Sequence, residues 1–134
     1  MYLYKHDIET TMKQQMLKVT HTVQEDIASS GVEEGIAVVY SPHTTAGFTI
    51  NENADPDVVT DMLSALEKTV PTIDSDYRHG EGNSHAHIKT TLFGASQSLI
   101  IHEGRIILGI WQDLYFCDFD GPRNRTYYVK LLKG

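Results

Sequence analysis

The chain has 134 residues, of which 40% are hydrophobic and 22% charged, and its 18 acidic and 11 basic side chains give a net charge of −7. These values predict one globular domain over residues 1–134 that can bury a sizeable core. The acidic balance argues against a nucleic-acid partner, because neutralising phosphates requires a basic face. A small anionic ligand held by a few arginines is still compatible with it.

Cysteine usage and hydropathy indicate the compartment. Cys117 is the only cysteine, which excludes an internal disulfide and is consistent with a reducing cytosol. The N-terminal residues lack the apolar core of a signal peptide, and no apolar run approaches the ~18 residues of a membrane helix. The sequence therefore predicts a cytoplasmic protein with no membrane partner.

The first predicted elements are a solvent-facing strand over 11–19 and a short helix over 23–30. Thr22 followed by Glu25 is a capping-box pattern that indicates the start of this helix. Gly31 indicates its end, because glycine readily adopts the left-handed conformation that terminates helices.

The centre of the chain predicts two strands and a long helix. Residues 35–42 are apolar and β-branched, which is typical of a buried strand, and 46–52 suit a neighbouring strand. The clearest helix lies within 53–71, where apolar residues recur at helical spacing. Asp55 can cap it, and Pro56 fits its first turn.

The C-terminal half predicts a loop over about 72–86 and then only strands. Residues 87–94 are the first strand-like segment, and Glu103–Gly104 between two apolar runs indicates a hairpin turn. Runs of strands with two main helices predict an α+β fold with a mixed, largely antiparallel sheet. The other strand-like segments are 96–102, 105–110, 111–119 and 125–132.

The predicted loop contains three histidines in "YRHGEGNSHAH", residues 77–87. His85 and His87 are two apart, so they point to one face if the segment is extended. Together with His79 they offer three imidazoles, the number of protein ligands in a catalytic zinc site. The alternative is that they are solvated or hydrogen-bonded locally. Glu81, between two glycines, is either a base or ligand held close to them or the exposed acid of a turn.

A second polar cluster occupies "SPHTTAGFTINENAD", residues 41–55. His43 directly follows a buried strand, where a rigid element can position a site residue, and it is a candidate third metal ligand. A structural histidine is the alternative. The other candidate site residues in this segment are Asn51, Glu52, Asn53 and Asp55. The alternative for these residues is that they form turns.

A third cluster lies in "GIWQDLYFCDFDGPRNR", residues 109–125. Arg123 and Arg125 share a face in an extended segment, and paired guanidinium groups suit a phosphate or carboxylate. The alternative is two surface arginines in an acidic protein. Gln112 is a polar candidate beside the only tryptophan, and the apolar surroundings of Cys117 indicate an inert core thiol. Nucleotide-loop and hydrolase-elbow motifs are absent.

Three motifs in the same order resemble the YjbQ-like family: "HTTAGFTINENADPDV", "YRHGEGNSHAHIK" with "LFGASQSL", and "GRIILGIWQDLYFCDFDGPRNR". The resemblance extends over about residues 35–132. It implies a homotrimer. Members of the family are also labelled secondary thiamine-phosphate synthases, so the resemblance implies this activity as well. It also implies metal ligation by His43, His79 and His87, and it ranks His85 below them. Other motif positions are candidates for catalysis (Glu81, Glu52, Asp55) and for substrate binding (Asn51, Asn53, Gln112, Arg123, Arg125).

These observations favour a metal-binding enzyme that acts on a small anionic substrate. Zinc suits three imidazoles, whereas thiamine-phosphate synthesis would call for magnesium, which prefers oxygen ligands. Metal-assisted hydrolysis of a phosphorylated or otherwise anionic metabolite is the alternative that fits the ligands better. A non-catalytic metabolite- or metal-binding trimer is the third hypothesis.

Overall fold

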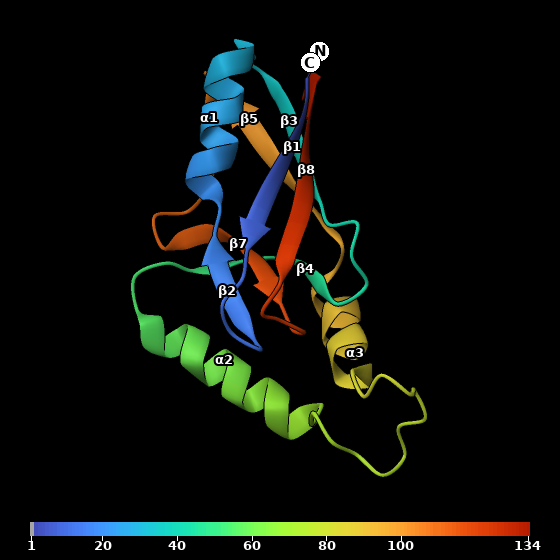
Figure 1. The fold of residues 1–134 in the computed structure, drawn as a ribbon. Coiled ribbons are helices and arrows are strands. Elements are labelled where there is room, and N and C mark those ends of the chain that lie inside the picture. The colour runs from blue at the N-terminus through green and yellow to red at the C-terminus, as the bar shows by residue number, and fades with distance from the viewer. Residues whose placement is uncertain (1) are drawn as a thin grey trace.

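The computed structural model describes residues 2–134 (Figure 1). All strand pairs between these residues are antiparallel, which confirms the predicted α+β class. None of the helices in this part of the chain is long and apolar enough to cross a membrane. In chain order the elements are β1 (Leu3–Glu9), β2 (Gln15–Lys18), α1 (Thr20–Ser30), β3 (Gly35–Tyr40), β4 (Ala46–Glu52), α2 (Pro56–Thr69), α3 (Ser84–Phe93), β5 (Ser96–His102), β6 (Arg105–Ile106), β7 (Gln112–Asp118) and β8 (Asn124–Lys133).

The strands form two sheets. The larger has the order β1-β8-β3-β5-β6, and the smaller has the order β2-β7-β4. Because β1 pairs with β8, the two ends of the chain lie together at one end of the molecule (Figure 1). Helix α2 lies across the opposite end, beside β2, and the loop after it leads to α3.

Two cores lie on the two faces of the smaller sheet. Successive side chains of a strand point to opposite faces, so Leu114 and Phe116 of β7 pack with α1 and the larger sheet. Tyr115 and Cys117 point the other way and pack with the apolar sides of α2 and α3. The molecule is therefore layered, with the smaller sheet buried on both sides.

Helix α2 follows its predicted signals. Asp55 precedes it in an extended conformation, and its Oδ1 accepts a hydrogen bond from the backbone N–H of Asp57 at 2.9 Å. Pro56 is the first helical residue, as expected from its fixed φ and missing N–H. The hairpin at Glu103–Gly104 is also confirmed, since both residues have positive φ and join β5 to β6.

The strand predicted over 87–94 is wrong, because α3 occupies Ser84–Phe93 and the structure has three helices. The buried side of α3 includes His85 and Lys89, so the segment carries no apolar stripe that would have indicated a helix. The C-terminal end of α3 packs directly on β4, where the Phe48 N–H donates to the Gly94 carbonyl at 3.0 Å. Any side chain at Gly47 would collide with that carbonyl.

Smaller differences concern the edges of elements. Strand β1 was not predicted, and β6 ends at Ile106 instead of continuing to residue 110. Helix α1 starts at Thr20 with Val19 as its cap residue, and no side chain caps it, so the predicted capping box does not form. Gly31 ends α1 in the left-handed conformation, as predicted.

Candidate functional site

One polar cavity brings together residues from three separate stretches of the chain. Its volume is about 440 Å³. His43 comes from the connection between β3 and β4, His79 and Glu81 come from the loop before α3, and His87 comes from α3 itself. The β7–β8 connection and β8 supply Arg123 and Arg125. The full lining is Pro42, His43, Thr44, Thr45, His79, Glu81, Asn83, His87, Asp120, Arg123 and Arg125.

Helix α3 separates His85 and His87, which would share a face only in an extended segment. Residues two apart in a helix point about 200° apart, so His87 faces His79 while His85 is buried on the other side. The His79 and His87 rings are edge to face with centroids 5.6 Å apart. The Nδ1 atom of His85 lies 3.2 Å from the Lys89 ammonium, which donates to it. The extended conformation that would have placed His85 and His87 on a common face therefore does not form.

His43 is held in a defined protonation state. Its Nε2 accepts a hydrogen bond from the backbone N–H of Thr126 at 3.0 Å. Burial and the nearby positive charge of Arg125 hold the pKa of His43 below its ordinary value. The ring is therefore neutral near pH 7, and its proton lies on Nδ1.

Arg125 is a buried support of the cavity. Its guanidinium forms two hydrogen bonds with the Asp118 carboxylate, at 2.7 and 3.1 Å, and a third with the Thr45 hydroxyl at 2.8 Å. Burial favours a raised pKa for Asp118, but hydrogen bonds from Arg125 and its other neighbours hold that pKa below its usual range. Three of the five N–H donors of Arg125 are engaged and its side chain is almost fully buried. Arg125 therefore contributes mainly positive charge to the cavity, and few direct contacts with a ligand.

Arg123 reaches the cavity through a network that the sequence did not reveal. Its guanidinium pairs with the Asp120 carboxylate at 2.9 Å and remains half exposed. The amide nitrogen of Asn83 donates to Asp120 at 2.9 Å and to Glu81 at 3.3 Å. Asn83 and Asp120 are not among the predicted site residues, and only the fold brings them together. Asn83 and Asp120 connect the Glu81 carboxylate with the Arg123 guanidinium.

Of the two glycines that flank Glu81, Gly82 adopts a positive φ and shapes the loop. Gly82 has a φ of 74°, and its N–H donates to the His79 carbonyl at 3.2 Å. This turn lets the Glu81 carboxylate lie 3.9 Å from Nε2 of His79 while the side chain remains 72% exposed. Glu81 therefore borders both the imidazole pair and solvent.

The three predicted metal ligands are not equally available to bind an ion. His79 and His87 are close enough to share an ion. The Nε2 of His43 is occupied by the Thr126 N–H, and a neutral ring then carries its proton on Nδ1. Within residues 2–134, no three histidine, cysteine or acidic side chains converge in the manner of a metal site. The three-histidine set does not fit a metal ion in this arrangement.

The other predicted site residues lie elsewhere, because β4 runs away from the cavity. His43 precedes β4, whereas Asn51 and Glu52 end it, roughly 20 Å further on at strand spacing. There, Glu52 accepts hydrogen bonds from the backbone N–H groups of Ala54 and Asp55. Asn51, Asn53, Asp55 and Gln112 likewise bond to neighbouring turns or the end of α2.

The fold and the cavity define a small α+β protein with a histidine- and arginine-lined site. A family model described as UPF0047 protein YjbQ-like matches residues 4–134. The chain belongs to this family, which confirms the resemblance of its three motifs.

Relatives and solved structures agree with this assignment. UPF0047 protein YugU of Bacillus subtilis is 50% identical over 125 residues, covering 93% of this chain and 95% of YugU. A UPF0047 protein of Methanocaldococcus jannaschii is 47% identical, covering 97% of this chain and 94% of its own. A crystal structure of a YjbQ/UPF0047 protein from Clostridium acetobutylicum matches with a TM-score of 0.94 and 50% identity, over 96% of this chain and 99% of that one. A YjbQ-like protein of unknown function from Sulfolobus solfataricus matches with a TM-score of 0.94 and 26% identity, over 99% and 97% of the two chains.

Proposed function

We propose that this protein is a hydrolase that binds a small phosphorylated metabolite in the histidine cavity and cleaves its phosphate ester. One observation carries the proposal: His43, His79, His87 and Arg123 converge on one cavity from three separate stretches of the chain. Imidazole and guanidinium groups together are suited to binding a phosphoryl group and moving protons beside it.

Each residue has a role that its surroundings support. The half-exposed guanidinium of Arg123 binds the phosphate oxygens, and the Nδ1–H of neutral His43 donates to the same group. Glu81 accepts a proton from water as the water oxygen bonds to phosphorus. The ester P–O bond breaks, and the leaving oxygen takes a proton from the imidazolium form of His79 or His87. The sum is one water consumed, with an alcohol and a phosphate released.

We limit the proposed metal site to His79 and His87, which lie close enough together to bind one zinc ion. A bound zinc ion would replace the imidazolium proton donor, because a ligated imidazole is not protonated at its ligating nitrogen, and would instead supply Lewis acidity to the leaving oxygen of the substrate. Magnesium, and with it thiamine-phosphate synthesis, is less well supported. Magnesium prefers several oxygen ligands, whereas this site presents two imidazoles with the Glu81 carboxylate beside them.

The proposal includes a homotrimer and the cytoplasm as compartment. The solvent face of the larger sheet exposes Ile36, Ile100 and Leu132, which are cross-strand neighbours. Contiguous exposed apolar side chains of this kind are typical of protein–protein interfaces. The free, fully buried Cys117 is consistent with a reducing compartment.

Calorimetric titration with inorganic phosphate tests the site, first on EDTA-treated protein and then after zinc addition. Arg123→Gln should weaken phosphate binding roughly tenfold or more, because a charge-assisted hydrogen bond is lost. Arg105→Gln on β6 makes the same charge change outside the cavity and should bind normally. His87→Ala should lose any zinc that the wild type holds, which metal analysis of the two proteins would measure.

Turnover is measured separately as phosphate released from glycerol phosphate. Glu81→Gln should bind phosphate and lose turnover, because the amide cannot accept the proton. Phosphate binding without any turnover in the wild type would show a binding protein instead of a hydrolase. No phosphate binding with or without zinc would refute the proposed site.

A further inference from the structure

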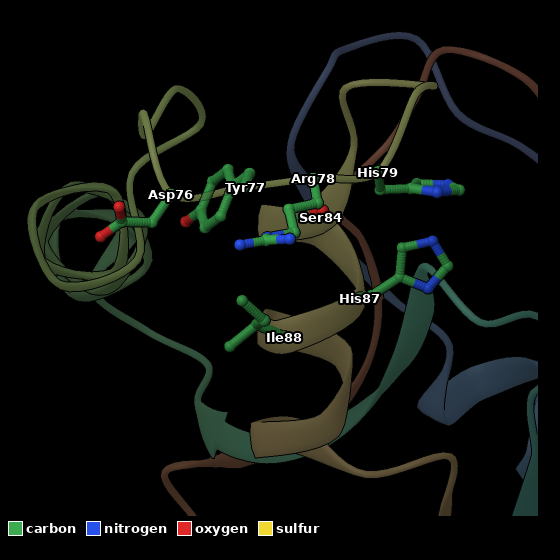
Figure 2. Close-up of a pocket in the computed structure, with 7 residues that line it drawn as sticks. All are labelled: Asp76, Tyr77, Arg78, His79, Ser84, His87 and Ile88. Carbon is green, nitrogen blue, oxygen red and sulfur yellow. The ribbon is translucent and has the colours of Figure 1, made fainter.

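A second hollow shares the His79–His87 pair with the histidine cavity, and Figure 2 shows the residues that line it. Its volume is about 580 Å³, and both imidazoles line it as well as the first cavity. The two imidazoles therefore border both spaces. The full lining of the second hollow is Asp76, Tyr77, Arg78, His79, Ser84, His87 and Ile88.

The two spaces differ in chemistry. The histidine cavity contains buried ion pairs and hydrogen-bonded carboxylates, whereas the hollow presents an aromatic ring, a guanidinium and an aliphatic side chain. Tyr77, Arg78 and Ile88 gather on one side of it, with His79 and His87 opposite (Figure 2). Asp76 lies at the far end, beyond Tyr77, away from the imidazoles.

The Tyr77 ring is held in place. Its hydroxyl donates a hydrogen bond to the Pro71 carbonyl at 2.7 Å, at the point where the chain leaves α2. The ring is half-buried, so one side remains available to a ligand. A flat surface that is already ordered binds a planar group with little further loss of conformational entropy.

Arg78 and Ile88 complete a surface for a planar group. Arg78 is exposed and has no ion-pair or hydrogen-bond partner among residues 2–134, although the protein is acidic. A free guanidinium stacks readily on aromatic rings. Ile88 follows His87 on α3 and is 41% exposed, which leaves apolar area next to the imidazole pair.

We propose that this hollow is the subsite for an aromatic group carried by the substrate, so that the substrate class is an aromatic phosphate ester. The inference rests on the proposed function, since it assumes a phosphate bound by Arg123. The phosphoryl group occupies the histidine cavity, the ester oxygen lies at the His79–His87 pair, and the ring packs against Tyr77, Arg78 and Ile88.

The test compares calorimetric titrations with phenyl phosphate and with inorganic phosphate. Wild-type protein should bind phenyl phosphate more tightly than phosphate. Tyr77→Ala should weaken phenyl phosphate binding by about threefold to tenfold, the range expected for one aromatic contact, and leave phosphate binding unchanged. Tyr77→Phe retains the ring and should bind both ligands like the wild type. Thermal unfolding of each variant verifies that the loop change leaves the fold intact.

Arg78→Gln gives an independent second reading. It should lower the affinity for phenyl phosphate and not for phosphate, whereas Arg123→Gln should lower both. Phenyl phosphate that binds no more tightly than phosphate to the wild type would overturn the subsite and leave the phosphate site standing. Equal losses for both ligands in Tyr77→Ala would do the same. Failure of wild-type protein to bind either ligand would instead overturn the proposed function.

Discussion

Glu67 joins three segments at the base of the loop that leads to the histidine cavity. Its carboxylate accepts hydrogen bonds from the Thr72 backbone and hydroxyl, from Gln14, and from the fully buried ammonium of Lys89. Partial burial opposes ionisation, but these donors prevail and lower the pKa of Glu67 to about 2. Lys89 lies one turn from His85 on α3, so the contact also positions the helix that presents His87.

The pH dependence of stability tests this role. Because the pKa of Glu67 is lower in the folded protein than its reference value of 4.5, its ionised form favours folding above that pH. This contribution is lost as pH falls from 4.5 towards 2. Glu67→Gln should lower the free energy of unfolding by about 1 kcal/mol at pH 7, a modest value because the carboxylate is partly exposed and screened.

Chemical denaturation at several pH values would measure the effect. The difference between wild type and Glu67→Gln should shrink as pH falls from 4.5 and disappear below about pH 2, once the carboxyl group is protonated in the folded protein as well. Glu9→Gln is the control, since Glu9 is exposed on β1 and forms no ion pair or side-chain hydrogen bond among residues 2–134. A constant difference across the pH range would contradict the role of the ionised carboxylate.

At the scale of elements, α2 provides a test of whether Asp55 is catalytic or structural. Its carboxylate caps α2 at the far end of β4 from the histidine cavity. Asp55→Ala should therefore cost about 1 kcal/mol of unfolding free energy, the usual value of a lost N-cap. The side-chain oxygen of Asn in Asp55→Asn can still accept the capping hydrogen bond, so this variant should retain most of the unfolding free energy that Asp55→Ala loses. Phosphate binding should be unchanged in both variants, and a loss of binding without loss of stability would show a role in the site.

Local signals predicted the elements whose ends are set by their own residues. Asp55 and Pro56 mark the start of α2, and Glu103–Gly104 mark a hairpin, because capping and turn geometry depend on neighbouring residues. Helix α3 was missed because its buried side carries Lys89, which donates hydrogen bonds to Glu67 and Gln14 from distant segments, and His85, whose partner is Lys89. Hydrophobic periodicity cannot reveal a helix face that is buried through polar contacts.

At the scale of the whole molecule, the exposed face of the larger sheet determines the predicted assembly. Ile100 of β5 is 59% exposed and lies opposite Ile36 of β3. Ile100→Lys should shift the protein from a trimer to a monomer of 15.1 kDa in sedimentation, because it places a charge in the apolar contact. Ile73→Lys makes the same change in the exposed loop after α2 and should leave the trimer intact. A wild type that sediments as a monomer at micromolar concentration would contradict the trimer.

The sequence by itself determined the family, the α+β class and the choice of His79, Glu81, His87 and Arg123 as candidate site residues. These follow from ordered motifs and from residue types whose chemistry does not depend on the fold. Only the tertiary structure decided which motif residues meet. Strand β4 carries Asn51 and Glu52 away from the cavity, and α3 turns His85 away from His87. The backbone N–H of Thr126 donates a hydrogen bond to Nε2 of His43. These are long-range contacts, and a linear pattern contains no information on which distant segments pack together.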